Sequence, residues 1–148
     1  MTLQQWAEHG WLRQHATSPD EIEKLLAVVD RDLADACATN ISADSRFSIA
    51  YSAALNLCTI LLHASGYRAE RSQGHMRTVM SLPLILGADQ TEHAEYLETC
   101  RRKRHAAQYE YAGGATAADA DELVRLARGL RRKVIVWLRQ HHPDLLGD

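Results

Sequence analysis

The stretch FSIAYSAALNLCTILL, residues 47–62, decides the fold of this chain. Apolar side chains would lie on nearly every side of a helix formed by it, so we expect that helix to be buried at the centre of the molecule. Three alanines in its first half allow neighbouring helices to approach closely. Ser42 is a favoured N-cap residue before the stretch, and Gly66 after it suits a helix C-terminus. The sequence therefore predicts one central helix between these two residues.

Helical patterns flank the central segment on both sides. Ser18 and Pro19 predict the start of a preceding helix, in which apolar residues recur every three or four positions as far as Cys37. Thr116 predicts the start of the last helix, which has acidic residues in its first turn. Short loops favour antiparallel neighbours. The sequence thus predicts an all-α, up-and-down helical bundle of four to five main helices, forming a single domain over residues 1–148.

The composition is that of an ordinary globular chain, with 46% hydrophobic and 24% charged residues and a net charge of −2. No apolar run matches the length of a membrane span, and no basic segment precedes an apolar block at the N-terminus, so we expect neither a membrane segment nor a signal peptide. The isolated cysteines Cys37, Cys58 and Cys100 are expected to be reduced thiols, with Cys37 and Cys58 buried on apolar stripes. This usage is typical of a cytoplasmic protein.

Motifs for metal and cofactor binding are missing from the sequence. The eight histidines show neither an i, i+4 pair nor an H-E-x-x-H pattern, so no metal site is predicted. The glycines have neither the Walker spacing nor the dinucleotide-binding fingerprint, and no parallel sheet is predicted that would carry one. We therefore expect no cofactor.

Cations gather in the second half of the chain. Residues 1–70 hold 5 Lys/Arg and 9 Asp/Glu, whereas residues 71–148 hold 12 and 10. The densest run is CRRKRHAAQYEYAGG, residues 100–114, and we call residues 101–111 the basic strip. Its four consecutive cations have no interleaved acid, and the last helix adds Arg125, Arg128, Arg131 and Arg132. If these two helices are antiparallel neighbours, both sets would form one positive surface that attracts phosphate groups.

Helical spacing divides the strip into faces. Arg101, Arg104 and Gln108 share one face, and His105 and Tyr109 share another. The candidate phosphate-binding residues within the strip are Arg101, Arg102, Lys103, Gln108 and Tyr111.

A second polar segment, HASGYRAERSQGH, places Tyr67, Arg68, Arg71 and His75 beside two glycines. Arg68 is a further candidate, because its guanidinium suits a phosphate as well as a neighbouring carboxylate.

The strip resembles the motif of the HEPN superfamily (higher eukaryotes and prokaryotes nucleotide-binding domains). RHAAQYEY, residues 104–111, stands where those proteins carry Arg-Asn-x-x-x-His-x-Tyr. Arg104 falls on the Arg position, His105 on the Asn, Tyr109 on the His and Tyr111 on the Tyr. The stretches RFSIAYSAAL and LLHASGYR are also similar to a bacterial HEPN-like subgroup. Many HEPN proteins are metal-independent ribonucleases or toxins with a composite site at a dimer interface, and some pair with a nucleotidyltransferase that modifies the Tyr.

The resemblance implies a HEPN-like homodimer that binds RNA or a nucleotide phosphate through the basic strip. In a ribonuclease, Arg104 would stabilise the phosphate charge, and His105 or Tyr109 would transfer protons. Because a tyrosine is a poor base at neutral pH, hydrolysis is not part of the prediction. The alternative is a non-catalytic interaction module that binds an acidic protein such as a nucleotidyltransferase, with Tyr109 and Tyr111 as packing or modification sites. A purely structural bundle with a solvated basic face is the third interpretation.

Overall fold

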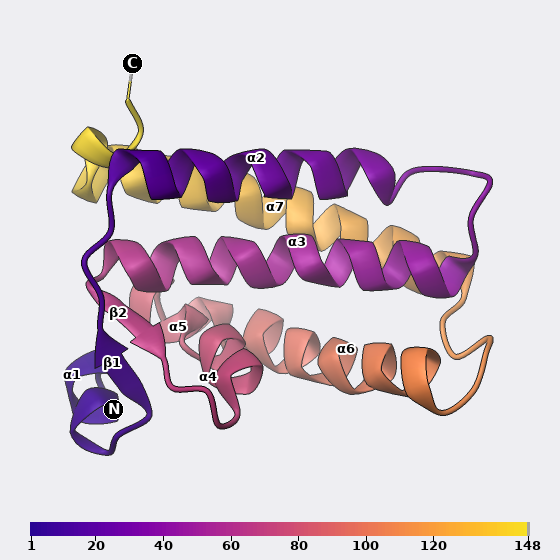
Figure 1. Cartoon of the computed structure of the whole chain (residues 1–148), viewed down its shortest axis with the longest axis horizontal. Helices are drawn as coiled ribbons and strands as arrows, with labels where there is room; N and C mark the ends of the chain where they lie inside the picture. The colour runs from indigo at the N-terminus through magenta and orange to yellow at the C-terminus, as the bar shows by residue number, and fades with distance from the viewer. Residues whose placement is uncertain (148) are drawn as a thin grey trace.

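The computed structural model describes residues 1–147 as an all-α helical bundle (Figure 1). The central helix α3 runs through the middle, and three further long helices pack around it. The bounds of these long helices are α2 (Pro19–Asp35), α3 (Ala43–Ala64), α6 (Thr91–Tyr109) and α7 (Ala117–His141). Their most extensive packing is that of α2 and α7 on α3, with α6 on another side of α3. The predicted fold class is confirmed.

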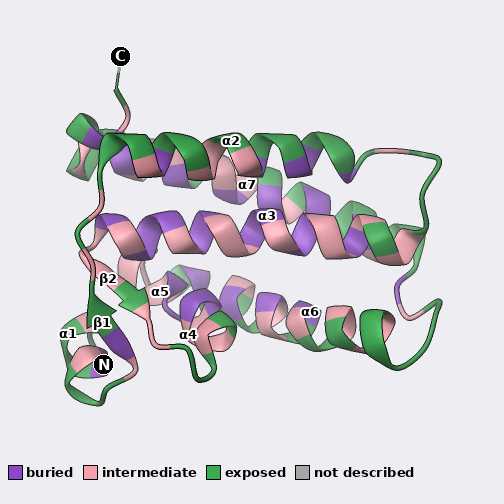
Figure 2. Cartoon of the chain, in the orientation of Figure 1, coloured by how far each residue is buried: buried purple, intermediate pink, exposed green. Residues whose placement is uncertain are grey.

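The central helix forms where the sequence predicts it. Ser42 is its N-cap, with a side-chain oxygen that accepts a hydrogen bond from the Ser45 N–H at 3.0 Å. Gly66, at φ +94°, turns the chain just after the helix ends, in a conformation that other residues rarely adopt. Figure 2 shows the buried positions spread around α3, whereas α2 presents an exposed outer face. Burial on several sides explains why α3 has so little amphipathic character.

One expectation about the central helix needs correction. The helix Ala43–Ala64 is long and apolar enough to cross a membrane by length and composition, although its longest uninterrupted apolar run is short. Of its most apolar stretch, 61% is buried inside the bundle. The apolar side chains of α3 are thus accounted for by helix packing.

The flanking helices start at the predicted caps. The Ser18 side chain accepts a hydrogen bond from the Glu21 N–H, and Pro19 is the first residue of α2. Thr116 and Asp119 form a reciprocal capping box at the start of α7. These short-range hydrogen bonds satisfy backbone N–H groups that a helix end would leave without partners.

The structure also contains two short strands that the sequence did not predict. β1 (Leu12–Gln14) and β2 (Tyr67–Ala69) pair in antiparallel register, with Leu12 opposite Ala69. Each has three residues, too few to show the alternation from which a strand is recognised. The remaining short elements are α1 (Leu3–Glu8), α4 (Gly74–Met80), α5 (Leu82–Leu86), η1 (Ala88–Gln90) and η2 (Pro143–Leu145). Together with α1, the strand pair covers the end of α3, where Trp6 and Leu12 pack on Leu62.

Asp44 holds the loop that follows the basic strip. Its carboxylate accepts hydrogen bonds from the N–H groups of Gly113 at 2.7 Å and Ala115 at 2.9 Å. Gly113 adopts φ +83°, which allows the tight turn between α6 and α7. The first turn of α3 thereby fixes where the strip ends and α7 begins.

The Asp44 contacts predict a pH-dependent contribution to stability. The backbone hydrogen bonds from Gly113 and Ala115 lower the pKa of Asp44, so the ionised form stabilises the fold. That contribution is fully present above about pH 4 and is lost as the pH falls through the lowered folded-state pKa. We expect Asp44→Ala to lower the urea midpoint at neutral pH, with a difference from the wild type that shrinks as the pH falls below about 4. An equal difference in urea midpoint between the variant and the wild type at neutral pH and at low pH would contradict this account.

Candidate nucleic-acid interface

The basic strip occupies the second half of α6, and its first three cations have acidic partners. Arg101 forms a two-pronged ion pair with Glu98 at 2.7 Å, and the Arg102 Nε lies 3.8 Å from the same carboxylate. Lys103 contacts Asp119 at 3.0 Å. The prediction that these cations lack partners is therefore wrong. Glu98 stands one turn earlier on the same helix, a spacing visible in the sequence, whereas Asp119 comes from α7.

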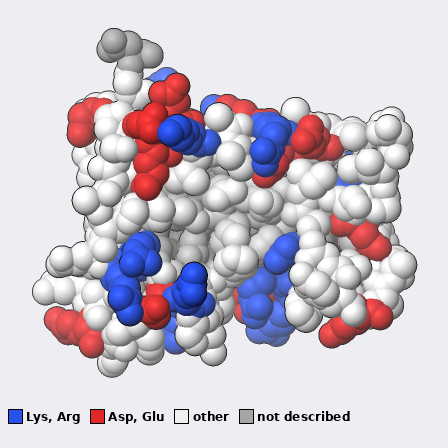
Figure 3. All heavy atoms as spheres, in the orientation of Figure 1, with Lys and Arg blue, Asp and Glu red and all other residues white. Residues whose placement is uncertain are grey.

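A groove between α4 and α6 nevertheless carries an excess of positive charge. Its volume is about 710 Å³. Its lining residues are Arg71, Gln73, Gly74, His75, Met76, Met80, Glu98, Arg101 and Arg102. Among these described residues the three arginines face a single carboxylate. Figure 3 shows cations gathered around the β2–α4 segment and over α6, while acids and bases alternate along α2.

Arg104 lies on the inner side of the strip, against α3. Its guanidinium carbon lies 5.2 Å from the centre of the Tyr51 ring, and one of its terminal nitrogens donates to the Gln108 side chain at 3.3 Å. Gln108 in turn donates to the Ser48 hydroxyl at 2.9 Å. The Arg104 Nε and the Tyr51 hydroxyl are both buried and have no hydrogen-bond partner within residues 1–147. Buried polar atoms without a partner are few in folded proteins, so each of these two needs an explanation.

Two titratable groups near Arg104, Tyr51 and His75, are kept neutral. Burial raises the pKa of Tyr51, although the charges of Arg104 and Arg101 oppose the rise. Partial desolvation lowers the pKa of His75, although its side chain is exposed, and the charges of Arg104 and Arg101 lower it further. His75 is thus a neutral imidazole at neutral pH, next to two guanidinium groups.

His75 and Arg71 join the strip only in the folded chain. The sequence placed them in a polar segment with Arg68, but not at the strip. The structure sets α4 against α6, so that Arg71 and His75 line the groove with Arg101 and Arg102. Arg68 lies elsewhere, exposed on β2 and paired through the backbone with Arg13. No periodicity within one helix could have indicated this contact between two helices.

His105, Tyr109 and Tyr111 do not line the groove. The rings of His105 and Tyr109 are in contact, with centres 4.9 Å apart and planes tilted by 45°, and Tyr109 is 73% exposed and Tyr111 59%. Arg104 faces α3, so in one chain the residues predicted for catalysis do not converge on one point. An ideal helix rotates by about 100° per residue, which separates Arg104 from His105. The exposed aromatic rings of the strip therefore lie apart from Arg104, which faces α3.

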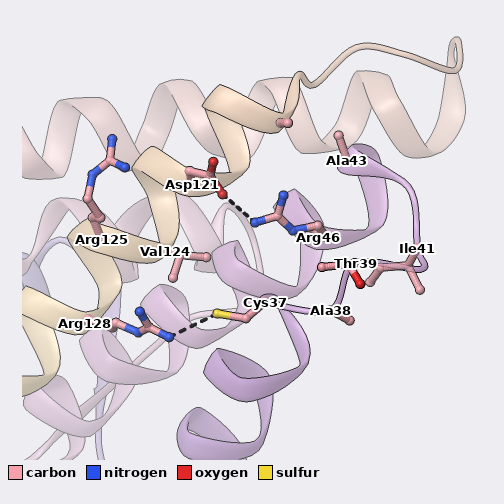
Figure 4. A pocket seen from close by; sticks show the side chains of 11 residues that line it. Cys37, Ala38, Thr39, Ile41, Ala43, Arg46, Asp121, Val124, Arg125 and Arg128 are labelled. Carbon is pink, nitrogen blue, oxygen red and sulfur yellow. Dashed lines mark hydrogen bonds and ion pairs between the residues drawn. The ribbon is translucent and has the colours of Figure 1, made fainter.

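The arginines of α7 line a different pocket. Arg125 and Arg128 border a cavity of about 630 Å³ between the start of α7 and the α2–α3 loop (Figure 4). There Arg46 pairs with Asp121 at 2.6 Å, and Arg128 donates to the Cys37 sulfur at 3.0 Å. This pocket shares no lining residue with the α4–α6 groove, so within the described chain the two sets of cations line separate pockets. Arg131 pairs with an acid of α2, at 2.6 Å.

The prediction for the cysteines is correct in part. Cys58 and Cys100 are buried, and burial raises their pKa values to about 12 and about 11. Cys37 is exposed, contrary to its expected place on a buried stripe. The reason is that α2 ends at Asp35, so Cys37 lies in the loop beyond the helix whose apolar face it was predicted to extend.

Side chains of the kinds that bind metals meet near the C-terminal end of α3. His15, Thr17 and His63 all form hydrogen bonds with one carboxylate oxygen of Glu21. Partial burial opposes ionisation, but these hydrogen bonds and the charge of His63 lower the pKa of Glu21 to about 2. His15 and His63 stand 48 positions apart in the sequence, so their spacing could not indicate the cluster.

The HEPN resemblance rests on two features: the alignment of residues 104–111 with the motif of that superfamily, and a helical bundle. The structure has such a bundle, which many unrelated proteins share, and it places Arg104 and Tyr109 on different faces of α6. Comparison of the chain with family models, with curated proteins and with solved structures found no match in any of the three.

Proposed function

We propose that this protein binds the phosphate groups of single-stranded RNA or of a nucleotide in the groove between α4 and α6. The observation that carries the proposal is the set of three arginines, Arg71, Arg101 and Arg102, around one carboxylate, Glu98. A guanidinium fork matches the oxygens of a phosphate. The groove volume lies within the usual range for small-molecule sites.

The neighbouring groups support the same proposal. His75 is neutral and offers one donor and one acceptor to a phosphate or a base. Arg104 and Tyr51 do not line the groove, but each has one buried polar atom, the Arg104 Nε and the Tyr51 hydroxyl, that has no partner within residues 1–147. A ligand oxygen that accepts from these donors would remove the cost of leaving them unpaired.

The exposed rings favour RNA over an isolated phosphate. His105 and Tyr109 form a tilted pair of exposed rings on the outer face of the strip, and exposed Tyr111 follows it. Unpaired bases stack on such aromatic side chains, while cations hold the backbone. We propose binding and not cleavage, because Arg104 and the His105–Tyr109 pair face different ways in one chain. In the homodimer that the HEPN resemblance implies, this outer face would be available to the groove of a second copy.

The proposal predicts a strong salt dependence of RNA binding. Labelled single-stranded RNA titrated with the protein over a range of salt concentrations should show a Kd that rises steeply with salt, as followed by fluorescence anisotropy. The double variant Arg71→Gln/Arg102→Gln should reduce the slope of log K against log salt by about 1.4, or about 0.7 for each phosphate that is no longer neutralised. Both side chains are exposed, so we expect their replacement to leave the fold intact.

Arg139→Gln is the matched control, since Arg139 is also exposed and stands on α7, outside the groove. It should bind RNA with the wild-type slope. A flat salt response of the wild type would contradict the proposal. It would favour the interaction module, in which the basic strip binds an acidic protein such as a nucleotidyltransferase and the exposed Tyr109 and Tyr111 are packing or modification sites.

A further inference from the structure

Two histidines and a glutamate from three separate segments meet near the C-terminal end of α3. This end lies far from the last residues of the basic strip. His15 follows β1, Glu21 lies in the first turn of α2, and His63 lies in the last turn of α3. One oxygen of Glu21 is 2.8 Å from the His15 Nε2 and 2.9 Å from the His63 Nδ1. The centres of the two imidazole rings are 4.0 Å apart. All three ligand-type atoms lie within 4.8 Å of one another.

We propose that His15, Glu21 and His63 form a binding site for a divalent metal ion of the zinc class. Zinc bonds of about 2.0–2.2 Å would put the ligand atoms of a tetrahedral ion about 3.3 Å apart. The oxygen–nitrogen distances in this cluster are about 0.5 Å shorter than this ligand–ligand distance. Small side-chain rotations would therefore widen the triangle formed by the three ligand atoms enough to hold an ion. Two imidazoles and one carboxylate suit zinc, whereas calcium and magnesium prefer oxygen ligands alone.

The surroundings of the triangle hold its members in place. The Thr17 hydroxyl donates to the same Glu21 oxygen at 2.7 Å, as an outer partner that orients a metal-binding carboxylate does. The His15 backbone N–H donates to the Gly66 carbonyl at 2.9 Å, which fixes His15 beside the end of α3. The triangle is thus supported by contacts outside its own three side chains.

The site is accessible to solvent. The side chains of His15, Glu21 and His63 are 21%, 34% and 16% exposed. An ion can therefore reach the triangle, and a water molecule can complete its coordination, as in zinc sites with three protein ligands.

A bound ion would link three parts of the fold. It would connect the segment after β1 to the first turn of α2 and to the last turn of α3. Because a metal that binds only the folded chain adds its binding free energy to the stability of that state, zinc should raise the unfolding temperature. The inference is independent of the phosphate site, since none of the three residues lines the α4–α6 groove.

The test is titration of the untagged chain with zinc by isothermal calorimetry at neutral pH. We expect saturation at about one ion per chain and a rise in the unfolding temperature with zinc. Each of His15→Ala and His63→Ala should weaken binding by at least about tenfold, because each removes one of three ligands. Thr17→Val, which keeps the shape but removes the hydroxyl, should weaken binding by about tenfold or more. His105→Ala, which removes an exposed histidine of α6, is the control and should bind zinc like the wild type.

A second measurement does not depend on how the variants fold. The wild-type chain loaded with Co²⁺ in place of zinc should show the visible absorption bands of a four- or five-coordinate site, and an excess of zinc should remove them. Wild-type protein that takes up no zinc overturns the proposal. So does binding that survives in the double variant His15→Ala/His63→Ala, or a cobalt spectrum like that of the hydrated ion.

Discussion

Replacing Leu57 by Ala is expected to lower the free energy of unfolding by about 2–5 kcal/mol. Leu57 is fully buried in the middle of α3, within the main hydrophobic cluster. Helices pack around α3 on several sides, so few surface atoms are available to fill the space that the missing side chain leaves. The measurement is urea unfolding followed by circular dichroism. The midpoint should fall with little change in slope.

Val136→Ala is the matched control for this prediction. Val136 is an aliphatic residue of α7 that is 52% exposed, so its replacement should change the free energy of unfolding by about 0.5 kcal/mol or less. If the two substitutions cost the same, α3 is not the centre of the core.

The central position of α3 could be predicted because its signals are local. Apolar residues surround the helix, Ser42 lies before it and Gly66 after it, and each feature acts within one or two helical turns. The starts of α2 and α7 are equally local, since Ser18 and Thr116 bind backbone N–H groups three residues ahead. Hydrogen bonds over so short a span appear in the sequence as residue types at fixed positions.

The candidate sites depend on contacts between distant segments, and the sequence predicted them poorly. Lys103 finds its acid on α7, and His75 comes to the strip from α4. The β1–β2 pair joins residues more than 50 positions apart. Periodicity within a helix carries no information about which face meets which neighbour, so the sequence could not indicate the contact of Lys103 with Asp119. Glu98, the partner of Arg101 and Arg102, stands one turn earlier on the same helix, so that pairing was visible in the sequence and the prediction missed it. The orientation of Arg104 toward Tyr51 also depends on a contact between two helices, so the sequence did not predict it.

Tyr51 belongs to the core and contacts Arg104, which follows the groove residues Arg101 and Arg102 on α6. Its ring is buried in α3 beneath the Arg104 guanidinium, but its hydroxyl makes no hydrogen bond within the described residues. A buried hydroxyl without a partner costs about 1–3 kcal/mol. A phenylalanine would fill the same space without that cost. The core alone gives no reason for a tyrosine at this position.

Tyr51→Phe is therefore expected to raise the free energy of unfolding by about 1 kcal/mol in the absence of ligand, as measured by urea unfolding. The same substitution should weaken RNA binding by about tenfold, because a bound phosphate would lose a donor beside Arg104. Greater stability with weaker binding is typical of a residue kept for function. A loss of stability with unchanged RNA affinity would show instead that the hydroxyl stabilises the core. It would also mean that Arg104 and Tyr51 take no part in the proposed phosphate site.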